Sequence, residues 1–244
     1  MIVAANWQRG VLRAMRVKNH PIEVVEVTDL TPWYRRVRVH APGFLGALEP
    51  YPTMWVRLWV PSLKRDMLVQ RGYTIVDPDP ASGTFCLDFV LHEPEGAAAR
   101  WARNAAVGTA AEVAYTPQRL VLDPSLSAIV LAGDATAVPA IESVLAALPD
   151  GAEPHVIIQD DHPDRLRLGG ARPRSVTWVD THPDGRGVVD AIAALGLGRS
   201  GTYVWAAGER RLVKAVREHA RADLGLPREQ QHTQYYWITG KDAG

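Results

Sequence analysis

The spacing of apolar residues along the chain changes near residue 124. Before this point, short alternating or β-branched runs are separated by turn residues, which is typical of strands in an antiparallel barrel or sandwich. In the clearest run, Phe85, Leu87 and Phe89 alternate with residues of other kinds, as in a strand with one buried face. The same pattern predicts strands at residues 21–27, 34–40, 55–60, 73–76 and 84–91, and the Ala-rich segment 96–105 predicts a short helix.

After residue 124, short continuous apolar runs alternate with segments whose apolar residues have helical spacing. These patterns predict strands at 128–131, 155–158, 176–179, 203–205 and 233–238, and helices at 138–148, 188–195 and 209–224. Strands that alternate with helices form a parallel sheet with helices on both faces. We therefore predict an antiparallel β-barrel domain over residues 15–123, followed by a parallel-sheet α/β domain over residues 124–244.

Composition removes several classes of function. Among the 244 residues, 27 Lys and Arg balance 27 Asp and Glu, whereas proteins that bind nucleic-acid phosphates usually carry a basic surplus. Cys86 is the single cysteine, which excludes an intrachain disulfide framework and a Cys-rich metal or iron–sulfur site. No apolar run approaches the ~18 residues of a membrane-spanning helix, and the N-terminus lacks the basic stretch of a signal peptide. We expect a soluble, cytoplasmic protein without nucleic acid, membrane insertion or a protein metal site.

Several short motifs follow one another along the chain. Residues 71–74 read RGYT and fit R-x-Y-T, residues 87–92 read LDFVLH, and residues 96–102 read GAAARWA. Further along, the chain reads LAGDATAVPAI over 131–141 and YVWAAGE over 203–209, and Tyr236-Trp237 precede Gly240. With the opening segments 29–32 and 35–37, these motifs resemble those of the siderophore-interacting protein family, in the same order. This family belongs to the ferredoxin-reductase-like flavoproteins.

The resemblance implies that the first domain binds FAD. Arg71 would then contact a flavin phosphate, because a guanidinium group matches phosphate geometry. Tyr73 would lie against the isoalloxazine ring, and Thr74 would hydrogen-bond near flavin N5, which is the catalytic position. Gly96 at a helix start would offer backbone N–H groups to the pyrophosphate. The cofactor-binding residues implied in this domain are Arg71, Gly72, Tyr73, Thr74, Asp88, Val90, His92, Gly96, Ala97, Ala98, Ala99 and Trp101.

The second domain lacks the G-x-G-x-x-G fingerprint. Gly133-Asp134 nevertheless places a helix start at the carboxyl edge of the sheet, where ligands bind in such folds, although a plain strand-to-helix turn is the structural alternative. Asp160 and Asp161 would repel a 2′-phosphate and favour NADH, unless Arg210, Arg211 or Lys214 reaches the nucleotide. The residues predicted to bind a cofactor here are Gly133, Asp134, Thr136, Ala207, Gly208, Glu209 and Trp237. For Trp237, packing within the last strand is an equal alternative.

The resemblance further implies an oxidoreductase that passes electrons from NADH or NADPH, or from a ferredoxin, through FAD to ferric iron held by a siderophore. Reduction would release the iron, because hard oxygen donors hold Fe(III) better than Fe(II). Cations that could steer an anionic chelate are Arg57, Lys64, Arg65 and Arg119, with solvated surface charge as the alternative.

Three of the residues that depart from the family pattern leave other functions open. Ala97 and Ala99 replace a Pro and a Ser, and Glu93 replaces a Gly. These changes remove a hydroxyl from the expected phosphate site and add a negative charge near it. The alternatives are a reductase of free flavin or another electron carrier, and a non-enzymatic siderophore-binding module that has lost FAD.

Overall fold

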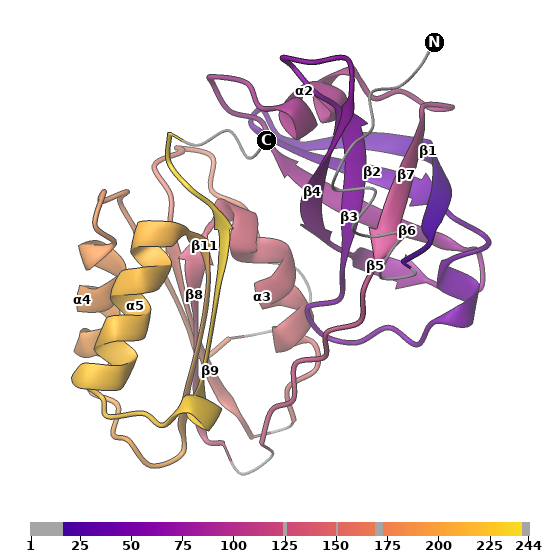
Figure 1. Ribbon diagram of the computed structural model, residues 1–244. Helices are drawn as coiled ribbons and strands as arrows, with labels where there is room; N and C mark the ends of the chain where they lie inside the picture. Colours follow the sequence, from indigo (N-terminus) through magenta and orange to yellow (C-terminus); the bar gives the residue numbers. More distant parts are fainter. Residues whose placement is uncertain (1–16, 124–125, 150, 169–172, 241–244) are drawn as a thin grey trace. The chain divides into compact units, whose positions relative to one another are not determined.

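The computed structural model describes residues 17–123, 126–149, 151–168 and 173–240 (Figure 1). These residues form two compact units, of which one ends at Arg119 and the other begins at Leu120. The domain boundary expected after residue 123 stays a prediction, and residues 15, 16 and 124 lie outside the described ranges. Among the described residues, no helix is both long enough and apolar enough to cross a membrane.

The first unit is built on one seven-stranded sheet with the order β4-β3-β7-β1-β2-β6-β5. All of its neighbouring strands are antiparallel. Its elements are β1 (Asn19–Thr31), β2 (Tyr34–His40), η1 (Leu45–Ala47), β3 (Trp55–Pro61), β4 (Leu68–Thr74), β5 (Val76–Asp79), β6 (Thr84–Val90), α2 (Ala97–Asn104) and β7 (Ala110–Tyr115). The apolar side chains of alternate strand positions and of α2 form a common core inside the sheet.

The two edge strands of this sheet are consecutive in the chain. β4 and β5 lie at opposite ends of the strand order, yet only Ile75 separates them. The Ile75 amide donates to the Met54 carbonyl at 2.8 Å, which holds the crossing in place. Since one residue spans so little distance, the two edges lie close together and the sheet is rolled into a barrel. The predicted single strand at 73–76 is therefore wrong, because the chain changes edges in the middle of it.

Two other features of the first unit differ from the sequence prediction. β7 (Ala110–Tyr115) was not predicted, because its sequence AAEVAY has few of the β-branched and aromatic residues that mark strands. β1 extends over 13 residues to Thr31, whereas the predicted strand ended at residue 27. The short helix predicted at 96–105 is confirmed as α2.

The second unit is a five-stranded parallel sheet with the order β10-β9-β8-β11-β12. Its elements are β8 (Ala128–Asp134), η2 (Ala135–Ala137), α3 (Val138–Leu145), β9 (Glu153–Gln159), β10 (Ser175–Val179), α4 (Arg186–Ala194), β11 (Thr202–Glu209), α5 (Arg210–Ala222), η3 (Arg228–Gln230) and β12 (Gln231–Trp237). Figure 1 shows α4 and α5 over one face of the sheet and α3 over the other. The predicted fold class, an antiparallel barrel followed by a parallel α/β sheet, is confirmed.

Candidate functional site

The RGYT motif forms the last four residues of β4, immediately before the crossing to β5. β4 pairs with β3, so that Gly72 lies opposite Arg57 and Thr74 opposite Trp55. Successive strand residues point to opposite faces of a sheet. Tyr73 packs against the barrel core, whereas buried Thr74 belongs to the opposite face. Among the described strands, only β3 pairs with β4, which leaves the other edge of β4 unpaired. A ligand along that edge of β4 can contact side chains from both faces of the sheet.

An aromatic stack joins the RGYT motif to helix α2. The ring centroids of Tyr73 and Phe89 lie 4.3 Å apart, and those of Phe89 and Trp101 lie 5.6 Å apart. The three residues come from β4, β6 and α2. Burial raises the pKa of the Tyr73 hydroxyl, although the charge of Arg71 opposes this shift. The stack therefore brings the motif residues of three separate segments into one cluster inside the barrel.

The N-terminus of α2 is open to an anion. Gly96 is the N-cap residue, no side chain caps it, and the first turn contains no acidic residue. The acidic residues just before the helix point to its arginines: Glu95 accepts from Arg100 at 2.7 Å and lies 3.0 Å from Arg103, and Glu93 lies 3.3 Å from Arg103. The charge that Glu93 adds is thus opposed by a cation on α2. Backbone N–H groups of such a helix start can bind a phosphate.

The three predicted cofactor residues on the DFVLH segment, Asp88, Val90 and His92, have different surroundings. Asp88 accepts a bidentate pair of hydrogen bonds from Arg36, at 2.8 Å to each oxygen, and its side chain is only 2% exposed. Burial raises the pKa of the Asp88 carboxyl, and Arg36 opposes this effect. Val90 ends β6 opposite Tyr34. His92 is exposed and lies next to the position that a Gly96 side chain would occupy.

The four predicted substrate-binding cations fall into two groups. Arg57 donates to the Thr116 hydroxyl at 2.9 Å and lies 4.5 Å from the Trp55 ring centroid, and burial lowers the pKa of its guanidinium. The guanidinium carbon of Arg119 lies 4.8 Å from the Tyr51 ring centroid, and Arg119 belongs to the segment after β7 that also contains Thr116. Lys64 and Arg65 belong instead to the exposed loop between β3 and β4. Arg57 is four residues before the end of β3, and each strand residue advances about 3.3 Å. The loop that contains Lys64 and Arg65 therefore begins about 13 Å from Arg57 along the strand.

In the second unit, Asp134 connects the carboxyl ends of β8, β11 and β12. Its Oδ1 accepts from the backbone N–H and the hydroxyl of Thr136, and its Oδ2 accepts from the Glu209 amide at 2.7 Å and from Trp237 Nε1 at 2.9 Å. Burial raises the pKa of the Asp134 carboxyl, and these four hydrogen bonds oppose the rise. The structure thus brings together the predicted residues Asp134, Thr136, Glu209 and Trp237.

Two glycines allow the strand ends to approach Asp134. A Cβ on Gly208, whose φ is +129°, would lie 2.4 Å from Asp134 Oδ2. A Cβ on Gly133 would lie 2.4 Å from the Ala207 carbonyl oxygen and 2.5 Å from the Ala137 Cβ. No side chain fits at such distances, so both glycines are required by the packing of β8 against β11. The predicted residues Gly133, Ala207 and Gly208 therefore have a structural role.

The helix starts at this edge differ from that of α2, because each one is bonded to a carboxylate of the chain itself. Asp134 accepts from the Thr136 amide before α3, Asp184 from the Arg186 amide in α4, and Glu209 from the Arg211 amide in α5. Burial acts to raise the pKa of Glu209, but hydrogen bonds from Thr239, Arg211 and Leu212 outweigh it and hold the pKa below its ordinary value. At each of these three helix starts, a carboxylate of the chain therefore accepts an N–H group that could otherwise bind an anion.

Acidic side chains also follow β9. Asp160 is buried; its Oδ1 lies 2.6 Å from His162 Nδ1, and its buried Oδ2 has no hydrogen-bond partner among the described residues. Asp161 is exposed and accepts from the Thr181 amide at 2.6 Å, which lowers the pKa of its carboxyl. Among the described residues, no group of three or more His, Cys, Asp or Glu side chains is arranged to hold a metal ion.

Sequence reasoning did not find three residues that organise these clusters. Arg36 and Asp77 form the ion pairs around Asp88, and Thr239 donates to Glu209 through both its amide and its hydroxyl. The one available signal was the carboxylate of Asp88 within an otherwise apolar β6, which needs a cationic partner when it is buried. The partner itself is 52 residues away in the chain.

The antiparallel barrel followed by a parallel α/β sheet is the fold of the ferredoxin-reductase-like proteins. Residues 62–119 match the family model of the siderophore-interacting FAD-binding domain, and residues 126–240 match that of the siderophore-interacting protein. The chain belongs to the siderophore-interacting protein family and contains its FAD-binding domain.

Curated relatives include proteins named as transporters and proteins named as reductases. The chain is 30% identical over 248 residues to the mycobactin import ATP-binding/permease protein IrtA of Mycobacterium tuberculosis, with 99% of this chain and 28% of that protein covered. It therefore spans little more than a quarter of the IrtA proteins that it matches. It is also 26% identical over 230 residues to the ferric acinetobactin reductase of Acinetobacter baumannii, with 90% and 79% covered.

Solved structures share the fold. The siderophore-interacting protein SipS from Aeromonas hydrophila superimposes with a TM-score of 0.81 at 24% identity, with 93% of this chain and 94% of that chain covered. A ferredoxin NADP+ reductase from Neisseria gonorrhoeae with bound FAD and NADP superimposes with a TM-score of 0.69 at 16% identity, with 90% and 99% covered. At these identities the similarity concerns the fold.

Proposed function

We propose that this chain is an FAD-dependent ferric-siderophore reductase that draws electrons from NADH or NADPH. The observation that carries the proposal is the open N-terminus of α2, which the stack of Tyr73, Phe89 and Trp101 joins to the RGYT motif. An open helix start with no acidic residue in its first turn suits a pyrophosphate. The names of the acinetobactin and vibriobactin reductases among its relatives support the reaction and the class of substrate.

The residues of the first unit fit the roles that the family resemblance implies. Arg71 and the backbone N–H groups that follow Gly96 would hold the phosphates, and Tyr73 and buried Thr74 would border the flavin ring. Bound FAD supplies the ability to accept a hydride and to pass on single electrons. Asp88 would act indirectly, because Arg36 already occupies both of its oxygens.

The second unit would receive the electron donor. Exposed Asp161 adds negative charge after β9 and would repel a 2′-phosphate. This charge supports NADH rather than NADPH as the better donor. A ferredoxin is the alternative donor, and the single cysteine of the chain supports a cytoplasmic location.

The ferric siderophore would approach cations of the first unit. Arg57 and Arg119 both lie beside the segment that follows β7, so their charges can act on one anionic chelate. Lys64 and Arg65 are on a different part of the barrel and would contribute at most to long-range attraction. The siderophore supplies the ligands of its iron, so no protein ligand is needed.

Absorbance spectroscopy of the full chain tests the proposal. We expect the protein to bind FAD, NADH to bleach the flavin band, and a ferric siderophore to restore it while a chromogenic ferrous chelator reports Fe(II). A protein that binds ferric siderophore but never FAD would be the non-enzymatic module. Reoxidation by free flavin or another electron carrier, but not by a ferric siderophore, would instead identify a reductase of that carrier.

A further inference from the structure

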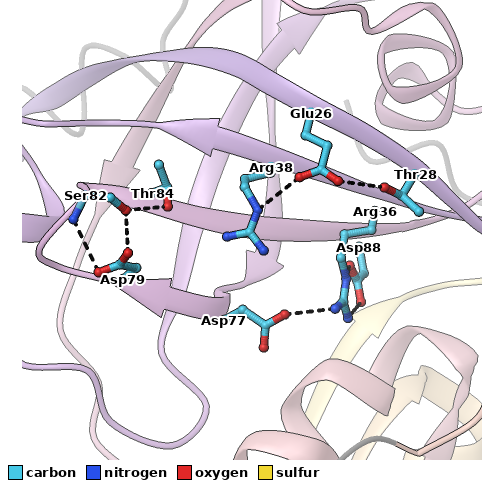
Figure 2. A network of polar contacts seen from close by, with 9 residues as sticks. All are labelled: Glu26, Thr28, Arg36, Arg38, Asp77, Asp79, Ser82, Thr84 and Asp88. Carbon is cyan, nitrogen blue, oxygen red and sulfur yellow. Dashed lines mark hydrogen bonds and ion pairs between the residues drawn. The ribbon is translucent and has the colours of Figure 1, made fainter.

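Arg36 forms a three-residue ion cluster on the barrel with Asp88, a predicted site residue, and with Asp77, which is not among the predicted site residues. Its guanidinium binds both oxygens of Asp88 at 2.8 Å and Oδ2 of Asp77 at 2.9 Å. Figure 2 shows Arg36 between the two carboxylates, while Arg38 and Glu26 form a separate pair at 3.5 Å. Arg36 is on β2, Asp88 on the adjacent β6 and Asp77 on β5, so the cluster crosses three strands.

The two carboxylates belong to the two segments that carry the flavin motifs. Asp77 is three residues after Thr74, on the far side of the crossing from β4 to β5. Asp88 begins the DFVLH segment, which continues through Gly96 into α2. Arg36 therefore holds β5, which directly follows the RGYT motif, against the strand that leads to the open helix start.

The backbone at Asp77 indicates that this contact controls a local conformation. Asp77 has a φ of +43°, in the left-handed region that residues other than glycine rarely adopt. The pairing of β5 with β6 is irregular between Val76 and Asp79, so the ladder does not fix the position of Asp77. Such a conformation persists only where surrounding contacts hold it, and the bond to Arg36 is one such contact.

The opposite face of the same strands shows why the position matters. Phe89, next to Asp88 on β6, packs on Tyr73 of the edge strand β4 with ring centroids 4.3 Å apart. The aromatic stack thus joins β4 to β6, and the ion cluster on the other face joins β5 to β6 and β2. A shift of β5 relative to β6 would move Tyr73 and Thr74 relative to α2.

We propose that Arg36 is a positioning residue of the flavin site, which aligns the RGYT motif with α2 through Asp77 and Asp88 without touching the cofactor. This inference rests on the proposed function, because it assumes that the first unit binds FAD.

Asp77→Asn tests the inference in the full chain. The substitution removes the charge bound by Arg36, keeps a residue type that tolerates positive φ, and leaves the buried Asp88 pair intact. We expect the dissociation constant for FAD to rise about 3- to 10-fold, the visible circular dichroism of the bound flavin to change, and the unfolding midpoint of the FAD-free protein to stay near that of the wild type. Glu26→Gln is the matched control, because it removes an equal charge from the same face without contacting Arg36.

The outcomes separate the inference from the proposed function. Weaker FAD binding and altered circular dichroism in Asp77→Asn but not in Glu26→Gln support it. Equal affinity of Asp77→Asn and wild type, or equal weakening by both variants, overturns it. If Asp77→Asn unfolds, Arg36→Lys keeps the charge and loses the two-pronged contact, and the same readouts apply. Failure of the wild type to bind FAD overturns the proposed function itself.

Discussion

The indole Nε1 of Trp237 donates a hydrogen bond of 2.9 Å to Oδ2 of Asp134. The bond joins the end of β12 to the end of β8, although β11 lies between these two strands. It gives Trp237 a defined role within the second unit, even though the side chain is 44% exposed.

Trp237→Phe removes this donor and leaves the aromatic bulk. We expect the free energy of unfolding to fall by about 1–3 kcal/mol, since hydrogen bonds to charged groups contribute in this range. Denaturant unfolding monitored by far-ultraviolet circular dichroism measures the change. Tyr235→Phe is the control, because its hydroxyl bonds to Arg217 at an exposed position. Equal effects of both variants would contradict the role of the Asp134 bond.

Gly208→Ala tests the close approach of β11 to Asp134. The added Cβ would lie 2.4 Å from Asp134 Oδ2, at a φ of +129° that Ala rarely adopts. We expect a loss of about 3 kcal/mol or more in the free energy of unfolding. Gly198→Ala is the matched control, because its Cβ would meet nothing within 4 Å. A Gly208→Ala variant as stable as Gly198→Ala would show that the strand ends do not pack as described.

The lowered pKa of Glu209 predicts that the free energy of unfolding decreases in acid. Its pKa is lower in the folded protein than its ordinary value of 4.5. Its contribution is therefore fully present above pH 4.5 and is lost as the pH falls through the folded pKa. We expect the wild type to lose more free energy of unfolding than Glu209→Gln between about pH 7 and pH 3.5. Glu229→Gln, an exposed carboxyl outside this cluster, should follow the wild type.

Arg71→Ala tests the phosphate contact of the RGYT motif. Loss of one charge-assisted hydrogen bond corresponds to about 1.5–3 kcal/mol, or roughly a 10- to 150-fold weaker affinity for FAD. Flavin fluorescence titration of the folded variant measures it. Arg65→Ala removes a cation from the exposed loop between β3 and β4 and should leave FAD affinity unchanged. Wild-type affinity in Arg71→Ala would remove this residue from the site.

NADH should reduce the bound flavin faster than NADPH. The expectation follows from exposed Asp161, whose negative charge after β9 would repel a 2′-phosphate. Stopped-flow bleaching of the flavin band compares the two donors. Asp161→Asn should narrow the difference by removing one repelling charge. Faster bleaching by NADPH would contradict the predicted preference for NADH but not the proposed reductase activity.

Local patterns predicted most elements of this fold, because period and turn chemistry act within a few residues. The segment 84–91 alternates clearly and is a strand, and the Ala-rich segment 96–105 is a helix. The strand break at Ile75 was not predictable in this way, because it depends on which strands pair across the barrel. β7 was missed for a related reason, since its place between β3 and β1, rather than its composition, makes AAEVAY a strand.

In the candidate site, too, local motifs were predictable from the sequence and long-range contacts were not. The resemblance of the motifs indicated RGYT and the LAGD segment, and both lie at strand ends in the structure. The contacts of Asp88 and Asp134 could not be deduced, because Arg36 and Trp237 approach them from 52 and 103 residues away. An acidic residue in an apolar strand predicts that its carboxylate has a hydrogen-bond or ionic partner. The sequence does not predict which residue that partner is.

The crossing of the barrel by one residue limits how this protein can change in length. Ile75 is the single residue between β4 and β5, so the connection has no spare length. An inserted residue would separate the two sheet edges or change the position of the RGYT motif in β4. The exposed loop between β3 and β4 and the turn after Asp79 have no such restriction. Insertions and tags should therefore be accepted at these two places, while the interval from the RGYT motif to β5 stays fixed.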